Sequence, residues 1–168
     1  MDMKRQLKKV QTLIADANMK KEYIIRKAKL DDIEVLLTLF QKHALYEKSD
    51  FIAENKKQSL KKYLFDEKIL NCLVIEIDNK IIAYTTYLKQ FSTWDVNFYL
   101  YLDCLFIEEE FRKLGLGAQL MNNIKEEAKK LGCNQIQWQT PSFNENAIKF
   151  YNKIGANSKS KKRFFLEI

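Results

Sequence analysis

Two of the four glycines in this 168-residue chain stand one residue apart, at 115 and 117, in the stretch FRKLGLGAQL. Before them the apolar run NFYLYLDCLFI at 97–107 predicts a central strand, and after them the hydrophobic spacing predicts a helix to about Lys130. A strand that passes through glycines into a helix is a layout that binds phosphate in α/β proteins. A tight turn without any ligand is the alternative explanation of the same spacing.

The physical case for an anion site rests on the backbone. Side chains at 115 and 117 would keep an anion away from the main chain, and glycine removes them. The first N–H groups of the helix and the positive end of its dipole attract a negative group, and Arg112 and Lys113 add charge beside it. No Gly-Lys-Ser/Thr follows, which excludes a Walker loop, and Leu120 occupies the third glycine position of a dinucleotide fingerprint.

The remaining pattern predicts one mixed α/β domain over 23–168, a central sheet flanked by helices. Predicted strands lie at 23–28, 71–77, 81–91, 97–107, 135–140 and 163–168, and predicted helices at 29–48, 54–65, from the glycine pair to about 130, and 144–156. Asn144 is the expected cap of the last helix, and Gly132 and Gly155 are the expected ends of the last two helices. A lysine-rich amphipathic helix at 4–21 predicts an N-terminal helical extension over 1–22.

Charge and cysteine content narrow the setting. Lysine plus arginine is 29 and aspartate plus glutamate is 22, so the net charge of +7 favours an anionic partner. The basic run NSKSKKRFF at 157–165 is interpreted as a solvated hairpin, so nucleic acid is not the expected partner. Three cysteines far apart give no zinc spacing, so we predict no metal site and a reduced, cytoplasmic protein. No apolar run approaches the roughly 20 residues of a membrane span, and no membrane partner is expected.

Two motifs together resemble the GNAT family of N-acetyltransferases. Its first signature, Q/R-x-x-G-x-G/A after a central strand, is matched by Arg112, Gly115 and Gly117. Its second signature is a helix that is matched by Asn144, Ala147, Phe150, Tyr151, Gly155 and Ala156. The resemblance covers 23–168 and implies the GNAT fold. Lys113 departs from the glycine or arginine that the family commonly has there.

The resemblance implies acetyl-coenzyme A as the cofactor. The loop that would hold its pyrophosphate consists of Arg112, Lys113, Leu114, Gly115, Leu116, Gly117 and Ala118. The backbone of Leu105, Phe106 and Ile107 would pair with the pantetheine arm like an added strand, and Asn144 and Tyr151 would also contact the cofactor. Family members splay two neighbouring parallel strands to admit that arm, which here would be 97–107 and 135–140.

The expected chemistry has three requirements. The acceptor amine must lose a proton, because an alkylammonium with a pKa of about 10.4 has no lone pair at neutral pH. The thioester carbonyl needs a donor as it becomes an oxyanion, for which a backbone N–H near Leu105 is the candidate. The departing thiolate needs a proton donor, and by the resemblance this is Tyr151. A purely structural core aromatic is the alternative reading of Tyr151.

On the acceptor side the chain looks most like the spermidine/spermine (diamine) group of the family. Tyr46 and Glu47 match that group's acceptor element, and Asp103 stands where the group has a glutamate that handles the amine proton. Cys104 replaces a second acid, and Trp94 beside Asp95 would line the mouth of the site. The alternatives are a solvated helix end for Tyr46 and Glu47, a strand-end carboxylate for Asp103, and a surface aromatic for Trp94.

The sequence thus predicts an N-acetyltransferase for the primary amine of a small molecule, with a diamine or polyamine as first candidate. An amino acid, an aminoglycoside or a peptide N-terminus is the alternative acceptor, and a non-catalytic basic binding module is the alternative class. Analogy with polyamine acetyltransferases predicts a homodimer. His43, one turn before Glu47, is expected to be a surface or half-buried helix residue, with a catalytic base as the alternative.

Overall fold

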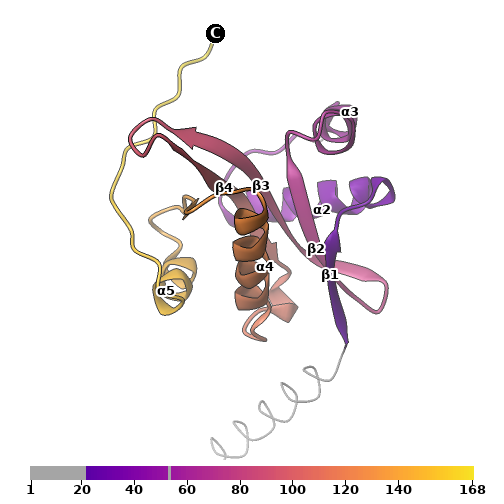
Figure 1. Ribbon diagram of the computed structural model, residues 1–168. Coiled ribbons are helices and arrows are strands. Elements are labelled where there is room, and N and C mark those ends of the chain that lie inside the picture. Colours follow the sequence, from indigo (N-terminus) through magenta and orange to yellow (C-terminus); the bar gives the residue numbers. More distant parts are fainter. Residues whose placement is uncertain (1–21, 53) are drawn as a thin grey trace, which may run out of the picture.

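The computed structural model describes residues 22–52 and 54–168, and the predicted N-terminal helix at 4–21 lies outside them. A five-stranded sheet has the order β1 (Tyr23–Lys27), β2 (Asn71–Ile77), β3 (Lys80–Ser92), β4 (Asn97–Ile107) and β5 (Ile136–Gln137). The first three pairings are antiparallel, and β4 pairs with β5 in parallel. The predicted mixed α/β architecture is confirmed (Figure 1).

Helices cover both faces of this sheet (Figure 1). On one face lie α2 (Ile33–Tyr46), which follows a short 3-10 turn at Leu30–Asp32, and α3 (Lys56–Lys61), which continues as a π-helical turn at Lys62–Asp66. On the other face lie α4 (Leu116–Lys130) and α5 (Glu145–Lys153), and a second 3-10 turn at Glu109–Phe111 joins β4 to the loop before α4. Because apolar side chains from both layers pack on it, β2 is buried along most of its length on both faces, as its apolar sequence requires.

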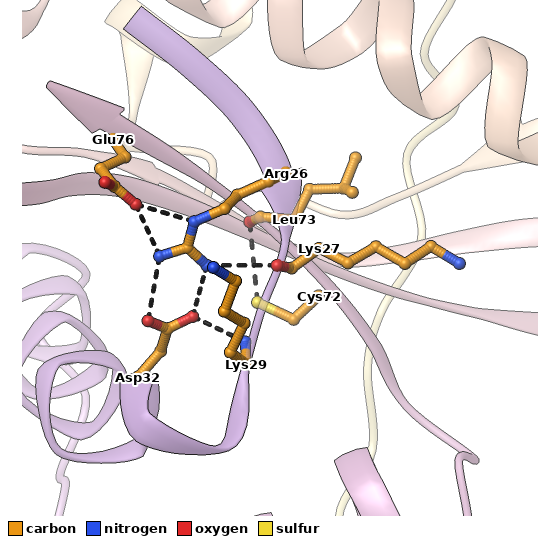
Figure 2. A network of polar contacts seen from close by, with 7 residues as sticks. All are labelled: Arg26, Lys27, Lys29, Asp32, Cys72, Leu73 and Glu76. Carbon is orange, nitrogen blue, oxygen red and sulfur yellow. Dashed lines mark hydrogen bonds and ion pairs between the residues drawn. The ribbon is translucent and has the colours of Figure 1, made fainter. Parts of the chain in front are cut away.

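An ion-paired cluster fastens β1 to the start of α2 (Figure 2). The Arg26 guanidinium donates to both carboxylate oxygens of Asp32, at 2.6 and 3.0 Å, and to Glu76 of β2 at 2.7 Å. The Lys29 backbone N–H donates to the same Asp32 carboxylate at 2.6 Å, so this buried side chain closes the turn before α2. The Arg26 cation holds the pKa of Asp32 below its usual range, against the opposing effect of burial.

Strand β4 contains one residue more than its partner. Thr86 lies opposite Cys104 and Tyr87 lies opposite Leu102, which leaves Asp103 as the extra residue of a β-bulge. After the bulge, Cys104 and Phe106 pack against the α2 side of the sheet, while Leu105 and Ile107 pack against the α4 side. For each later residue of β4, the bulge therefore sets which face of the sheet the side chain lies on. It also sets whether the backbone N–H and C=O point to β3 or away from it.

Strands β4 and β5 separate almost at once. Their pairing is limited to Leu100 with Ile136 and Tyr101 with Gln137, so the predicted strand at 135–140 is much shorter than expected. After β5 the Trp138 side chain turns to pack on the α4-side cluster and on Tyr151, at 5.0 Å between ring centroids. Beyond Tyr101, no strand of the described residues pairs with this edge of β4.

The predicted C-terminal strand at 163–168 is wrong: the segment forms no strand, and its side chains are exposed. The apolar side chains Phe164, Phe165 and Leu166 suggested a strand, but a strand needs an adjacent edge with which to exchange hydrogen bonds. The other elements that were predicted within the described residues exist, and those at 71–77 and 97–107 have the predicted bounds. Asn144 caps α5 by accepting from the Ala147 N–H at 3.2 Å, as predicted. None of the helices in 22–52 and 54–168 has the length and apolar character that a membrane crossing needs.

Candidate active site

The predicted anion loop begins α4. Gly115 is the residue before the helix and has φ of +81°, a left-handed conformation that favours glycine. A Cβ atom at 115 would have no atom within 4 Å other than those of its chain neighbours, so the backbone there lies open. The Ala118 and Gln119 amides bond to the Gly115 carbonyl, which leaves the N–H groups of Leu116 and Gly117 without an intrahelical acceptor. This geometry fits a bound anion.

Gly117 has a different reason for being glycine. A Cβ atom at this position would lie 3.2 Å from Cζ of Phe150 and 3.7 Å from Cδ1 of Ile107. The absent side chain therefore lets α5 pack closely against the start of α4. Sequence reasoning explained this glycine by the approach of an anion or by a tight turn, because its neighbour in α5 lies more than 30 residues away in the chain.

Arg112 turns back into the domain. Its Nε donates to the Ile107 carbonyl at 2.8 Å, and its guanidinium carbon lies 4.4 Å from the ring centroid of Tyr46 and 5.5 Å from that of Phe106. These contacts hold the loop against β4 and α2. Lys113 is the exposed cation of the pair, on a backbone with φ of +65°, and Leu114 packs on the α4-side core.

Only every second residue of β4 directs its backbone N–H and C=O groups to the free edge. The Glu108 N–H donates to the Ile82 carbonyl of β3. In an antiparallel pair, residues whose backbone groups bond to the partner strand alternate with residues whose backbone groups point away from it. Phe106 therefore bonds within the sheet to β3, whereas Leu105 and Ile107 direct their backbone groups to the side that β5 has left. The prediction that Phe106 offers its backbone to a cofactor does not fit this register. Its side chain instead packs in the α2-side core.

Tyr46 and Asn144 join the two helical layers at this gap. The Tyr46 hydroxyl donates to Oδ1 of Asn144 at 3.3 Å, and the same oxygen caps α5. Since Arg112 stacks on the Tyr46 ring, one tyrosine connects the end of α2, the anion loop and the start of α5. These contacts give both residues a structural role beside the binding roles that the sequence predicted.

Tyr151 of α5 is half-buried and packs on Trp138, which follows β5. Burial, with the Glu47 charge as the next cause and the Cys104 thiol after it, raises the pKa of Tyr151 to about 12. Its hydroxyl has no hydrogen-bond partner among the described residues, and it keeps its proton at neutral pH. The Glu47 charge, at the end of α2, therefore acts on Tyr151 of α5, on the other side of the sheet.

The residues that the sequence predicted for the acceptor lie at the end of α2 and at the bulge of β4. Glu47 is partly exposed just after α2, and its Oε1 lies 3.4 Å from Nε2 of His43. Asp103 is exposed, and its carboxylate accepts from the Thr86 hydroxyl at 3.4 Å. Cys104 is partly buried in the α2-side core, and burial together with the Asp103 charge raises the pKa of its thiol to about 12. This thiol stays protonated near neutral pH.

Trp94 is not brought to these residues within one copy of the chain. It lies in the turn between β3 and β4 and is 95% exposed. The strand between Asn97 and Asp103 alone spans about 20 Å, at about 3.4 Å per residue. Its predicted place at the mouth of the acceptor site is therefore not reproduced by a single copy.

The burial of His43 differs from what the sequence predicted. It is buried, with 8% of its surface exposed, rather than at or near the surface. Its Nδ1 lies 2.7 Å from the Tyr84 hydroxyl, and its ring stacks on Phe106 at 5.1 Å. Burial lowers the pKa of His43. The spacing of four residues to Glu47 was the available sequence signal, but Tyr84 is 41 residues away.

The sequence model of the acetyltransferase (GNAT) family matches residues 29–156. A thialysine N-epsilon-acetyltransferase from Bos taurus is 28% identical over 142 residues, covering 79% of this chain and 83% of that one. A spermidine/spermine N(1)-acetyltransferase-like protein from Homo sapiens is 22% identical over 79% of this chain and 20% of its own. The crystal structure of a possible acetyltransferase from Clostridium difficile has the same fold, with a TM-score of 0.74, 21% identity, and coverage of 87% and 97% of the two chains. The chain belongs to the acetyltransferase (GNAT) family and is an N-acetyltransferase, as its two motifs predicted.

Proposed function

We propose that this enzyme transfers the acetyl group of acetyl-coenzyme A to one amine of a small molecule that carries two amino groups, such as a diamine, a polyamine or a basic amino acid. The observation that carries the proposal is that the Tyr46–Asn144 hydrogen bond joins the end of α2, where Glu47 lies, to the start of α5, which carries Tyr151, while Asp103 is exposed at the bulge of β4. Two carboxylates near one proton donor favour a substrate with two positive charges. The thialysine and spermidine/spermine relatives are named for amines of this kind.

The residues present fit the cofactor. The open backbone at Gly115, with the unbonded amides of Leu116 and Gly117, suits the pyrophosphate, and the exposed Lys113 adds charge. The pantetheine arm would pair with the free edge of β4 at Leu105 and Ile107. The Ile107 carbonyl already accepts a hydrogen bond from Arg112, so the other backbone groups of these two residues would make the pairing. When bound, acetyl-coenzyme A supplies the thioester carbonyl and the thiol leaving group.

Each residue near the gap then has a distinct task. Glu47 and Asp103 attract the ammonium group and accept its proton, directly or through water. The Leu105 N–H, on the free edge of β4, is placed to donate to a developing oxyanion. Tyr151 donates a hydrogen bond to the departing thiolate. Because the pKa of Tyr151 is about 12 and that of an ordinary thiol is about 8.5, complete proton transfer from Tyr151 is uphill, and the phenol acts mainly as a hydrogen-bond donor.

The proposal is tested by measuring coenzyme A release over a panel of amines. The panel contains putrescine, spermidine, lysine and thialysine as diamino compounds, butylamine as a monoamine, an aminoglycoside and a peptide N-terminus. We expect turnover with diamino compounds at a kcat/KM at least tenfold above that of butylamine. Equal turnover of butylamine would refute the need for two charges, and turnover of the peptide alone would refute a small-molecule acceptor.

Variants assign the roles. Tyr151→Phe should lower kcat with little change in either KM, while Glu47→Gln and Asp103→Asn should raise the KM of the amine. The matched control is Asp66→Asn, an exposed carboxylate at the end of the π-helical turn after α3. An Asp66→Asn variant that loses as much as Asp103→Asn would show that the effect is general electrostatics and not a local acceptor site.

The setting that we propose is a homodimer in the cytoplasm. All three cysteines are free thiols, which suits a reducing compartment. The exposed apolar segment at 164–168 and the exposed Trp94 are surfaces that a second copy would cover. Light scattering after gel filtration at micromolar concentration measures the mass, and a 20 kDa species throughout would refute the dimer.

A further inference from the structure

A buried histidine stands directly behind the acceptor carboxylate. His43 lies on α2, one turn before Glu47, with Nε2 at 3.4 Å from Oε1 of Glu47 and Nδ1 at 2.7 Å from the Tyr84 hydroxyl. The carboxylate is partly exposed, whereas both rings are buried. The three side chains thus run from the core at β3 to the surface of the proposed acceptor site.

The two contacts fix the position of the proton on the imidazole ring. Burial strongly raises the pKa of Tyr84, so its hydroxyl stays protonated and is able to donate a hydrogen bond to Nδ1. A neutral imidazole that accepts at Nδ1 carries its hydrogen on Nε2, which faces Glu47. The opposite tautomer would direct the Nε2 lone pair at a carboxylate, which is repulsive.

Other groups around the ring keep it neutral. Phe106 of β4 stacks on one face of His43 at 5.1 Å, and burial is the main cause that lowers the pKa of the histidine. Arg112, from the loop before α4, acts in the same direction, whereas Glu47 and Asp103 raise the pKa. A neutral donor orients the carboxylate without cancelling the negative charge that an ammonium group needs.

We propose that His43 is a positioning residue of the acceptor site: its Nε2–H, fixed in place by Tyr84, orients the Glu47 carboxylate toward the substrate amine. The inference rests on the proposed function, because Glu47 has this task only if an amine binds beside it. The separation of 3.4 Å is long for a hydrogen bond, and contacts of this kind commonly tighten when the substrate is bound.

Two variants separate positioning from packing. His43→Leu keeps an apolar body of similar size and removes the donor, and His43→Gln retains an N–H donor near the position of Nε2. We expect His43→Leu to raise the KM of the amine about tenfold, with the KM of acetyl-coenzyme A changed less than twofold, and His43→Gln to recover part of the loss. An unchanged amine KM in His43→Leu, or equal rises in both KM values, overturns the proposal.

A spectroscopic readout does not depend on turnover. The chain has a single histidine, so ¹⁵N labelling of histidine gives one set of ring signals. We expect the Nε2–H tautomer, a mixture of tautomers in Tyr84→Phe, and a shift of the Nε2 signal in Glu47→Gln. Adding lysine or spermidine should shift the same signal in the parent enzyme. If no amine is turned over yet these shifts occur, the proposed reaction fails while the positioning of Glu47 stands; an Nδ1–H tautomer, or a signal insensitive to both Glu47→Gln and the amine, overturns the positioning role.

Discussion

Replacing Asp32 by alanine tests how α2 is held in register with the sheet. The carboxylate accepts two hydrogen bonds from Arg26 and one from the Lys29 backbone N–H, and only 8% of the residue is exposed. Removing one partner of a buried ion pair costs about 3–5 kcal/mol, chiefly because the other charge is left uncompensated. Here Arg26 keeps Glu76 at 2.7 Å, so we expect the lower end, about 3 kcal/mol.

Urea unfolding followed by far-UV circular dichroism measures this loss. With a slope of about 2 kcal/mol per molar urea, a loss of about 3 kcal/mol lowers the midpoint by about 1.5 M. The matched control is Asp31→Ala, the exposed neighbour in the same 3-10 turn, for which we expect a change within about 0.5 kcal/mol. Equal midpoints for the two variants would refute the role assigned to Asp32.

The pH dependence gives a second check with a definite sign. The pKa of Asp32 is lower in the folded protein than in the unfolded chain, so its contribution is present above the unfolded value of about 3.9. That contribution is lost as the pH falls through the folded pKa. The difference in unfolding free energy between the parent enzyme and Asp32→Ala should therefore be constant from pH 5 to 7 and shrink below pH 4. A difference that grows in acid contradicts the ion-pair explanation.

Four further predictions follow, two from the glycine geometry and two from pKa values. Gly115→Ala places alanine at φ of +81° and should lower stability by about 1–2 kcal/mol in urea unfolding; an unchanged midpoint contradicts this. Gly117→Ala should cost about 1–3 kcal/mol through contact with Phe150, and Phe150→Leu should relieve part of that cost in the double variant, whereas additive losses would exclude the contact. Because the pKa of Tyr151 is about 12, kcat should not fall between pH 8 and 10 through its ionisation, and a fall that disappears in Tyr151→Phe would show otherwise. Because the pKa of Cys104 is also about 12, its alkylation by iodoacetamide at pH 8, followed by mass spectrometry, should be at least tenfold slower than that of glutathione, and labelling at an equal rate would place the thiol in solvent.

The elements that the sequence predicted best are those whose pattern is local. The strand at 97–107 and the helix that ends at Lys130 have the predicted bounds, because continuous apolar character and helical spacing are visible in a short window. The C-terminal segment at 163–168 has the same apolar character, but a strand also requires an adjacent edge, and β5 is only two residues long. Composition within a window carries no information about that edge.

The site shows the same division between local and distant information. The glycine positions, the Asn144 cap and the order of the motifs were readable from the chain, because each depends on neighbours within a few residues. The environment of His43 depends on Tyr84, and the stacking of Arg112 depends on Tyr46, and both partners are far away in sequence. The bulge at Asp103 depends on the register between two strands, which the sequence of one strand does not specify.

That bulge also gives the chain one position that can change during evolution without moving the free edge of β4. Before it, the Leu100 N–H points toward β5 and donates to the Gln135 carbonyl; after it, Leu105 and Ile107 point to that side instead. A substitution at 103 alters the charge beside the proposed acceptor site and leaves this frame intact. Because Thr86 and Tyr87 are neighbours on β3, even the loss of residue 103 would bring Leu102 and Cys104 into regular pairing and leave Leu105 and Ile107 on the free edge. The charge at this position can therefore drift by replacement while the edge that Leu105 and Ile107 present stays the same.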